Sequence, residues 1–340
     1  MNTRLFSPLR LASAGLIVLV AAVALLVTQG SDHYLEIPDK AHPLAGLVKV
    51  PGATRQRDGG GIYYVDVLLK RASLLESLVP AVRPDGADLI PRRAVVEPGI
   101  SERERFKLEL ADMKVSQVIA SAVALRQLGY RVPVKAGGLR VVAVTSSSHV
   151  VGLLHPGDVI VSAEGKPVRT REDLRIILAR HRPGDVIKLG LRRGKQLLAL
   201  RVRTTSDRVE PKRPIIGVLP AQALEVHFPF PIKFNLGEVG GPSAGLAFAL
   251  ELLEQRGRDV DQGYKVAATG QIELDGSVTR IGGIKQKTIG ARESQIDVFL
   301  VPVDGDNARE AKRYAHGLKI IPVKSFQQAL HALATLPPKA

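Results

Sequence analysis

The longest apolar segment of the chain is a run near the N-terminus, residues 11–27, and no charge lies between Arg10 and Asp32. Crossing a bilayer takes about 20 apolar residues in a helix. Basic residues precede the run and acidic residues follow it, which favours a cytoplasmic N-terminus. The pattern therefore predicts a cytoplasmic tail over 1–8, a transmembrane signal anchor over 9–29, and a single-pass cell-membrane protein whose remaining residues are extracytoplasmic. The alternative is a cleaved signal peptide, which the small residues at 21–24 suit although they lie inside the run.

Residues 30–130 combine two apolar β patterns with one long helical pattern. The segments 48–50 and 61–69 flank a turn-like sequence at 57–60, which predicts a β-hairpin. A proline-rich link follows. Ser101 and Glu104 then have the spacing of a capping box, and Gly129 is suited to end the helix that they begin. Its apolar residues recur at helical spacing, so we expect a packing helix without a chemical role.

The remaining residues divide into two patterns. Residues 131–206 contain short β-rich runs at 139–144 and 159–161, a turn at Pro156-Gly157, and a helix over about 170–180. Residues 207–338 alternate helix and strand, with a helix from about Pro242 to Gln255 and another from Ile284 to Ser294. The predicted fold class is α/β (α+β), together with a small β-rich domain.

Charge and composition exclude several classes of function. The formal net charge is +15, but aromatic residues make up only 4% of the 340 residues and no nucleic-acid-binding motif is present, so we expect no nucleic-acid partner. The basic residues are spread along the chain, which favours attraction to an anionic membrane surface. Cysteine is absent and the eight histidines have no zinc-site spacing, so no metal or other cofactor is predicted.

Two glycine-rich segments carry the candidate chemistry. Ser243 lies in Gly240-Gly241-Pro242-Ser243-Ala244-Gly245, directly before an apolar helix. A developing oxyanion is favoured there by free N–H groups and by the positive end of the helix dipole. Lys287 follows in Ile281-Gly282-Gly283-Ile284-Lys285-Gln286-Lys287, in the first turn of a helix. A buried amine with a lowered pKa is able to act as general base for a serine nucleophile.

These segments resemble the proteolytic domain of the Lon family of serine proteases, over about residues 207–338. The resemblance implies that Ser243 is the nucleophile, Lys287 is the general base, Thr269 helps to hold the amine, and Lys285 is a neighbour. Gly241 and Pro242 support the serine, and N–H groups around Gly241 to Ser243 would hold the oxyanion. It also implies that residues 30–130 complete the protease sheet. Two positions depart from the pattern, because Gly240 and Gln271 stand where acids are common.

One other interpretation of the serine motif assigns it to a different class of hydrolase. Gly-x-Ser-x-Gly is also the nucleophile elbow of α/β-hydrolases, but Pro242 restricts the strained turn that an elbow needs. That reading would require His316 or His331 as the base. No Walker A sequence is present, since the segment Gly190–Gln196 has the wrong spacing. We therefore expect proteolysis that is independent of ATP.

Residues 131–206 resemble a PDZ domain of the bacterial protease type, on the Pro-Gly-Asp-Val-Ile and Gly-Lys-Pro-Val segments at 156–160 and 165–168. The resemblance implies that an extended peptide adds as a strand beside the helix at 170–180. The peptide-binding residues would be those of the loop and the edge strand, namely Gly137, Gly138, Leu139, Val141 and Val142. The alternative is a β domain that only packs against the protease.

Taken together, the sequence predicts a membrane-anchored, extracytoplasmic, ATP-independent serine endopeptidase with a Ser-Lys dyad, whose PDZ domain selects or positions protein or peptide substrates. A homo-oligomer, a hexamer by resemblance, is expected. The alternative function is a catalytically decayed PDZ scaffold that binds peptides in the cell envelope.

Overall fold

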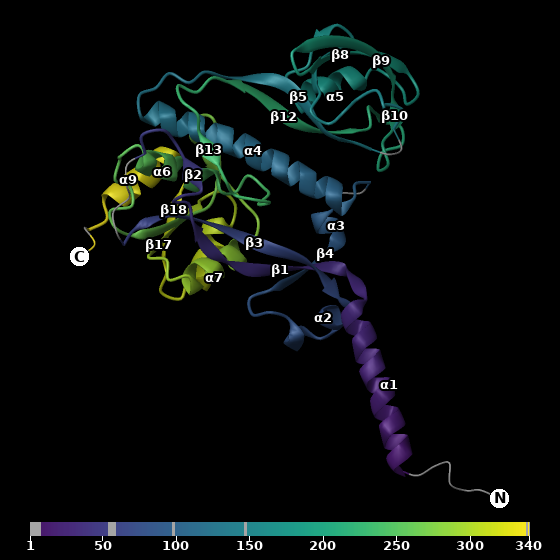
Figure 1. The fold of residues 1–340 in the computed structure, drawn as a ribbon, viewed down its shortest axis with the longest axis vertical. Coiled ribbons are helices and arrows are strands. Elements are labelled where there is room, and N and C mark those ends of the chain that lie inside the picture. Colours follow the sequence, from purple (N-terminus) through teal and green to yellow (C-terminus); the bar gives the residue numbers. More distant parts are fainter. Residues whose placement is uncertain (1–7, 54–58, 97–98, 146–147, 338, 340) are drawn as a thin grey trace, which may run out of the picture.

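The computed structural model describes residues 8–53, 59–96, 99–145, 148–337 and 339. Helix α1 (Pro8–Thr28) projects alone from one end of the molecule, and a β-rich unit lies at the opposite end (Figure 1). Apolar side chains of α1 such as Leu16, Ile17 and Val18 are more than 60% exposed. Among the described residues, no helix combines the length and apolar character needed to cross a membrane. Seven of the eight residues predicted as a cytoplasmic tail, 1–7, lie outside the described part.

The central feature is a six-stranded sheet built from two distant parts of the chain. Its order is β18-β17-β14-β3-β1-β4, and the parallel pairing of β3 with β14 joins the two parts. Pairings on the N-terminal side are antiparallel, and those on the C-terminal side are parallel. The strands are β1 (Gly30–Pro43), β3 (Gly61–Ser73), β4 (Asp88–Pro91), β14 (Lys265–Ala268), β17 (Val298–Pro302) and β18 (Lys319–Val323).

The predicted hairpin between residues 48–50 and 61–69 is wrong. β2 (Val48–Lys49) pairs with β13 (Lys233–Phe234), whereas β3 pairs with β1 and β14. β3 buries Ile62 and Val65, and the 14 residues of β1 give it a much longer antiparallel partner than the two residues of β2 could. Arg57 and Asp58 of the predicted turn lie outside the described residues.

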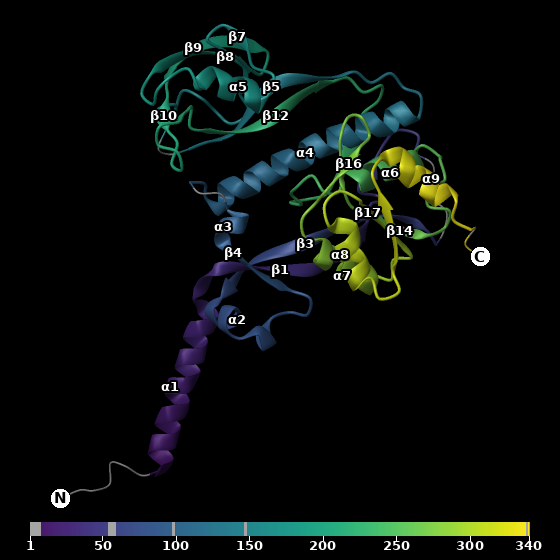
Figure 2. The same cartoon turned by 180° about the vertical axis from the view of Figure 1, so that it is seen from behind.

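Helix α4 (Glu102–Gln127) runs between the sheet and the β-rich unit (Figure 2). The predicted capping box is present, because Ser101 Oγ accepts from the N–H of Glu104 and the Glu104 carboxylate accepts from the N–H of Ser101. Gly129 follows with φ +87°, the left-handed geometry of a helix end. The other helices are α2 (Leu74–Leu78), η1 (Pro80–Val82), α3 (Arg92–Val95), α6 (Gly245–Gln255), α7 (Ile284–Glu293), α8 (Asn307–Tyr314) and α9 (Phe326–Ala334).

The β-rich unit is a second sheet of order β12-β5-β6-β8-β9, with β7 paired to β6 and helix α5 (Arg171–Leu178) beside it. It has its own core, separate from that of the six-stranded sheet. The Asp158 carboxylate accepts from the N–H of His155, as expected for the turn. The strands are β5 (Val134–Val144), β6 (Val159–Ala163), β7 (Lys166–Pro167), β8 (Val186–Arg193), β9 (Gln196–Arg203) and β12 (Val218–Val226). Two short pairs, β10 (Thr205–Ser206) with β11 (Pro214–Ile215) and β15 (Gln271–Ile272) with β16 (Val278–Thr279), lie outside these sheets.

Helix α7 approaches β1 so closely that one of its positions requires glycine. A Cβ atom built on Gly290 would lie 1.7 Å from the carbonyl oxygen of Asp39 in β1. Glycine normally weakens a helix interior, so its presence here is explained by the close backbone contact. This contact fixes the height of α7 over the sheet.

Replacing Gly290 by alanine is expected to destabilise the protein by about 3 kcal/mol, because the added methyl group overlaps a backbone atom that cannot rotate away. Thermal unfolding followed by circular dichroism measures the effect. Gly282→Ala is the matched control, since a Cβ atom there meets nothing within 4 Å. Equal unfolding midpoints for the two variants would contradict the close contact.

Candidate active site

Ser243 lies in the turn that precedes helix α6. The helix begins at Gly245, three residues later than the predicted start near Pro242, so Ser243 stands just outside its N-terminus. The carbonyl oxygen of Ser243 accepts hydrogen bonds from the N–H of Gly270, at 2.8 Å, and from Thr269 Oγ1, at 3.2 Å. The end of β14 therefore fixes the backbone of the serine.

Lys287 reaches Ser243 from the first turn of α7. Its Nζ lies 2.6 Å from Ser243 Oγ and 3.4 Å from Thr269 Oγ1. The lysine is 3% exposed, while Thr269 is fully buried. The structure thus brings together the three residues that the motifs singled out from three separate segments. Lys285 is directed elsewhere, since its Nζ bonds Asp88 Oδ1 at 2.6 Å.

Burial makes the protonated amine of Lys287 more acidic, so that it gives up its proton nearer to neutral pH. Desolvation lowers the pKa of its amine to about 8, because removal from water penalises the charged form. The negative charges of Asp66 and Glu36 act in the opposite direction and limit the shift. A lysine with this pKa is partly neutral near pH 7 to 8, which a general base requires.

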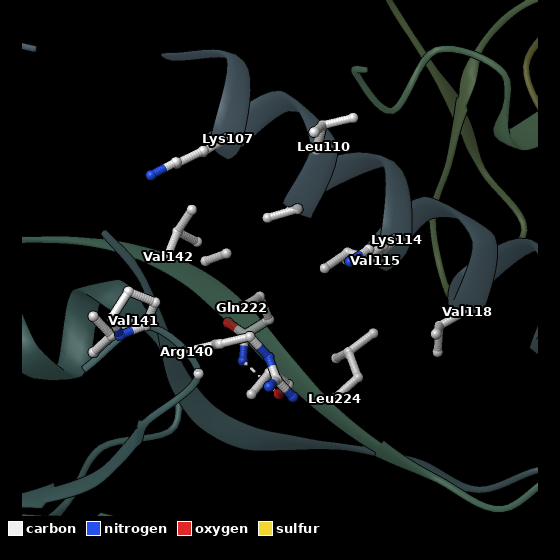
Figure 3. Close-up of a pocket in the computed structure, with 15 residues that line it drawn as sticks. Lys107, Leu110, Lys114, Val115, Val118, Arg140, Val141, Val142, Gln222 and Leu224 are labelled. Atoms are coloured by element: carbon white, nitrogen blue, oxygen red, sulfur yellow. Dashed lines mark hydrogen bonds between the residues drawn. The ribbon is translucent and has the colours of Figure 1, made fainter. Parts of the chain in front are cut away.

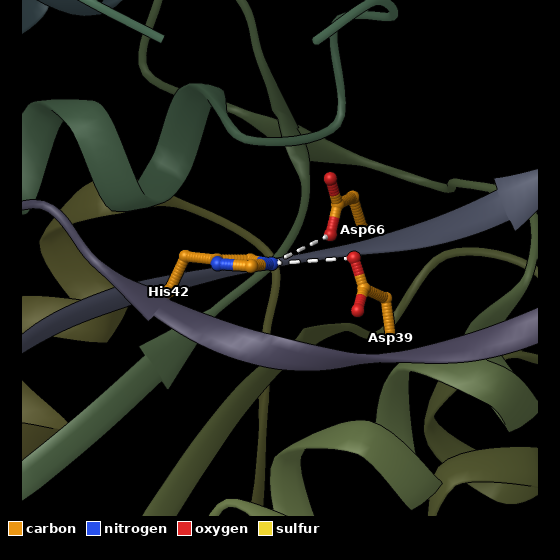
Figure 4. A group of neighbouring side chains, drawn as sticks. All are labelled: Asp39, His42 and Asp66. Carbon is orange, nitrogen blue, oxygen red and sulfur yellow. Dashed lines mark hydrogen bonds and ion pairs between the residues drawn. The ribbon is translucent and has the colours of Figure 1, made fainter.

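Asp66 and Glu36 were not identified from the sequence. They lie on β3 and β1, and burial raises the pKa of both carboxyl groups. Figure 4 shows Asp66 and Asp39 directed toward His42, whose Nε2 lies 3.5 Å from Asp66 Oδ1 and 3.3 Å from Asp39 Oδ2. One signal was available, since each of the two acids interrupts an apolar strand pattern.

Two clusters of the described residues have donors close enough for a cation, and neighbouring protein groups engage both. In the first, His42 lies between Asp39 and Asp66 and pairs with each of them. In the second, Glu254 accepts from the N–H groups of Val260 and Asp261.

The structure corrects the expected oxyanion donors. The N–H of Gly241 donates to the carbonyl oxygen of Glu109 at 2.9 Å, and Pro242 has no N–H. Within the described part of the chain, the N–H groups of Ser243 and Ala244 donate to no protein acceptor. These two N–H groups lie at the start of α6 and are the better candidates for binding an oxyanion.

Helix α4 positions the nucleophile loop, contrary to the expectation that it only packs. Ser116 Oγ donates to the carbonyl oxygen of Pro242 at 3.0 Å, and Glu109 accepts from Gly241 as described. Gly241 has φ +86° with open space beside it. Gly241 and Pro242 therefore support the site by holding the loop between α4 and α6.

The contact with α4 also explains Gly240, one of the two departures from the Lon pattern. A Cβ atom on Gly240 would lie 2.7 Å from Glu109 Cβ, so an aspartate does not fit without movement of α4. Gln271, the other departure, donates from Nε2 to Glu273 Oε1 at 2.8 Å. Neither departure disturbs the contact between Ser243 and Lys287.

The predicted peptide-binding residues of the β-rich unit lie on β5, but β5 is not a free edge. Strand β12 pairs antiparallel with β5 from Val218 opposite Val144 to Val226 opposite Val134. The ladder pairs Gly138, Leu139 and Val141 with residues of β12, and Gly137 and Val142 lie at its two register shifts. The prediction of a free edge strand is wrong, because a segment far along the chain occupies that edge.

Two cavities connect the β-rich unit to the nucleophile loop. A groove of about 540 Å³ lies between α4 and strands β5 and β12, with Leu110, Val142 and Leu224 directed into it (Figure 3). A second cavity of about 290 Å³ lies beside the nucleophile loop, and its lining includes Gln222 and Pro242.

Exchanging the carboxylate of Asp66 for an amide is expected to lower the pKa of Lys287 further, because the negative charge of Asp66 favours the protonated amine. In Asp66→Asn, the acidic limb of kcat/KM against pH should move to lower pH. Asp39→Asn is the matched control, since Asp39 raises the pKa of Asp66 but does not act directly on Lys287. A limb that moves to higher pH in Asp66→Asn would contradict this assignment.

Comparison with known proteins agrees with this geometry. The Lon protease (S16) C-terminal proteolytic domain matches residues 221–335, and a PDZ domain matches residues 126–204. Lon protease 2 of Bacillus subtilis (strain 168) is 31% identical over 123 residues, which are 36% of this chain and 21% of that protein. The Lon protease of Xanthomonas oryzae pv. oryzae (strain KACC10331 / KXO85) is 36% identical over 119 residues, 34% of this chain and 13% of that protein.

The chain spans about a fifth or less of the length of these curated relatives. Among solved structures, the PDZ domain of an SdrC-like protein from Listeria monocytogenes is similar over 25% of this chain and 88% of that chain, with 21% identity and a TM-score of 0.23. The two family matches and the similarity to Lon protease 2 show that the chain contains a Lon S16 proteolytic domain, which is a serine peptidase domain with a Ser-Lys dyad, and a PDZ domain.

Proposed function

We propose that this protein is an ATP-independent serine endopeptidase that cleaves unfolded or extended protein segments. The observation that carries the proposal is the hydrogen bond of 2.6 Å between Lys287 Nζ and Ser243 Oγ at a buried amine. Hydrolysis of a peptide bond needs no nucleotide in itself, and the sequence has no Walker A segment. We therefore assign no residue of this chain to ATP-driven unfolding of substrates.

The reaction begins with a nucleophile and a base that are already in contact. Neutral Lys287 takes the proton of Ser243 Oγ as this oxygen attacks the peptide carbonyl carbon. The N–H groups of Ser243 and Ala244 stabilise the oxyanion, and the protonated amine gives its proton to the leaving nitrogen. Water then hydrolyses the acyl-enzyme with Lys287 again as base, which restores both residues.

Localisation at a membrane is a further part of the proposal. Its support is the charge-free run at 11–27 and the exposed apolar surface of α1, which projects away from the catalytic body (Figure 1). In this arrangement the N-terminus is cytoplasmic and both domains are extracytoplasmic. Protease protection in sealed cells, with and without outer permeabilisation, measures this orientation. Release of the protein from the membrane fraction into the soluble fraction at high pH would contradict the proposed transmembrane anchor.

Cleavage of casein by the full chain in detergent, without nucleotide, tests the catalytic proposal. We expect steady turnover that ATP does not increase and that is lost in Ser243→Ala. A fluorophosphonate probe should label the unaltered chain and leave Ser243→Ala unlabelled. A chain that neither cleaves casein nor becomes labelled would favour the alternative function, a peptide-binding scaffold. The retained Ser243 and Lys287 do not suggest such a loss of activity.

Sedimentation of the same sample tests the expected homo-oligomer, a hexamer by resemblance.

A further inference from the structure

Outside helix α1, the structure exposes a run of five consecutive apolar residues. Residues 78–82 read Leu-Val-Pro-Ala-Val, from the end of α2 through η1, and each of the five is exposed. Leu78 is 68% exposed and Val82 is 45% exposed. Single exposed apolar side chains are normal in water, whereas a contiguous group indicates a contact with another protein or a membrane. We call residues 78–82 the apolar patch.

Packing in the core does not account for this apolar character. Helices α2 and η1 contain no buried residue. Elsewhere in the described chain outside α1, exposed large apolar side chains stand alone in the sequence or, at Val151 and Leu153, as a close pair. The apolar patch is therefore a distinct surface feature that requires an occupant.

The apolar patch lies beside the end of α1. The N–H of Leu74, the first residue of α2, donates to the carbonyl oxygen of Gln29 at 2.9 Å, and Gln29 directly follows α1. Val27 of α1 and Val82 line the same cavity of about 330 Å³. Figure 1 shows α2 at the point where α1 meets the catalytic body. A bilayer crossed by α1 would thus have its surface at the level of the apolar patch.

Basic side chains flank the apolar patch. Residues 70–83 contain Lys70, Arg71 and Arg83 but only one acid, Glu76. Basic side chains close to a membrane are attracted to anionic lipid headgroups. Apolar side chains accompanied by basic ones are typical of segments that lie in the interface of an anionic bilayer. The charge therefore favours such a bilayer as the occupant.

Hydrogen bonds hold the apolar patch in one shape before any lipid is bound. Arg83 Nε donates to the carbonyl oxygen of Glu76 at 2.7 Å, and Arg83 Nη2 donates to that of Ser77 at 3.1 Å. At the other end, Ser73 and Glu76 form the capping box that begins α2. Binding therefore requires little further ordering of the chain, which lowers its cost.

We propose that the apolar patch is a second membrane contact, which inserts Leu78, Val79 and Val82 into the headgroup region of an anionic bilayer beside the end of α1. This inference rests on the proposed membrane localisation of α1. A single helix leaves the catalytic body free to rotate about the helix axis. A second contact at the side of the helix fixes the orientation of the body relative to the bilayer.

The apolar patch is connected to the helix that carries Lys287. Gln286 Nε2 of α7 donates to the carbonyl oxygen of Gly86 at 3.2 Å and to Asp88 Oδ2 at 2.8 Å. Both acceptors follow the apolar patch within a few residues. Contact of the apolar patch with lipid therefore also sets the position of α7, and with it the dyad, relative to the membrane.

Fluorescent labels on single cysteines test the contact in the full chain. The chain has no cysteine, so Leu78→Cys and Val82→Cys each provide one site for the fluorophore NBD. The labelled proteins are reconstituted into vesicles of phosphatidylcholine and phosphatidylglycerol, with or without a lipid that carries a nitroxide near its headgroup. Emission from both labels should shift to shorter wavelength. The nitroxide should quench it several-fold more than it quenches emission from Leu197→Cys.

Two control positions separate the second contact from the anchor. Leu197 is 76% exposed on β9, in the β-rich unit at the end of the molecule opposite α1, so its label should remain in water. Val18→Cys lies in α1 and reports, with a nitroxide deeper in the acyl chain, whether that helix is in the bilayer. Quenching at position 18 without quenching at 78 and 82 would overturn the second contact and leave the anchor standing. No quenching at position 18 would overturn the membrane localisation, and this inference with it.

A charged variant tests the apolar side chains themselves. With the label at Ala81→Cys, the changes Leu78→Asp and Val82→Asp should abolish quenching, because carboxylates are repelled by anionic headgroups. Both replaced side chains are exposed, so the fold does not depend on them. Val186→Asp with Leu197→Asp changes two exposed apolar side chains of the β-rich unit and should leave quenching at position 81 intact.

Equal quenching in the two double variants would overturn the proposal. Emission at shorter wavelength without quenching by the nitroxide lipid would also overturn it, because protein, such as a second copy of this chain, would then cover the apolar patch.

Discussion

Replacing Lys287 by alanine is expected to reduce cleavage of casein by roughly a thousandfold or more. The amine is the only group hydrogen-bonded to Ser243 Oγ among the described residues, so its loss leaves a neutral hydroxyl without a base. General base catalysis contributes about 10²–10⁴-fold, and a nucleophile and base that act as a unit lose most of their effect together. Rates of casein cleavage and of fluorophosphonate labelling should fall together.

Lys285→Ala is the matched control for this loss. Lys285 lies on the same helix two residues earlier, but its Nζ bonds Asp88 and lies over the ring of Tyr314. We expect activity within a few-fold of the unaltered chain. Thr269→Val should have an intermediate effect, because Thr269 Oγ1 contacts Lys287 Nζ at 3.4 Å and does not take the proton. Equal losses for Lys285→Ala and Lys287→Ala would show that the base is misassigned.

The dyad could be predicted from sequence because its two segments have unusual local chemistry. Pro242-Ser243-Ala244-Gly245 and Gly283-Ile284-Lys285-Gln286-Lys287 each combine glycine with a reactive side chain at a helix start. Such local patterns can be recognised in the sequence without knowledge of the fold. The same holds for helices α6 and α7, whose observed bounds differ from the predicted ones by a few residues at most.

The electrostatic environment of Lys287 could not be predicted in the same way. Glu36 and Asp66 reach the amine only because β1 and β3 pair, and because β3 then joins β14 in parallel. The second of these pairings connects segments about 200 residues apart, and nothing in the local sequence specifies either one. The requirement for glycine at position 290 could not be predicted from the sequence either, because it depends on the contact of α7 with the backbone of Asp39.

The misprediction of β5 as a free edge has a different origin. The strand itself was recognised, and its side chains alternate as expected for a sheet. A strand pattern, however, describes the two faces of a sheet and not which edges are paired. Residues 214–224 have an apolar, uncharged composition that suits an added strand, and this was the available signal for the intramolecular partner.

A buried lysine also implies a cost in stability that can be measured. The amine has a pKa of about 8 in the folded protein, against about 10.5 when unfolded, so the folded state binds fewer protons between these values. Stability must therefore rise as the pH increases from about 8 to about 10.5. Below pH 8 the cost is complete and amounts to about 3 kcal/mol, since each pKa unit corresponds to about 1.4 kcal/mol.

Lys287→Met is consequently expected to stabilise the protein while abolishing its activity. Methionine retains most of the apolar volume of the lysine and carries no charge, so a gain of up to about 3 kcal/mol in the free energy of unfolding is expected at pH 7. The gain should vanish near pH 10.5, where the unfolded lysine is also losing its proton. Circular dichroism suits the measurement, because the chain has no tryptophan for fluorescence.

The comparison with Lys285→Met decides whether the gain belongs to the catalytic lysine. Lys285 keeps an ion pair with Asp88, so its replacement should bring no gain in the free energy of unfolding at pH 7. A Lys287→Met chain that is less stable at pH 7 would mean that the contacts of the amine with Ser243 and Thr269 stabilise the folded protein by more than burial of the charge costs. A gain confined to position 287 would instead mean that this fold tolerates a destabilising charge because the neutral form of that lysine is what the serine needs.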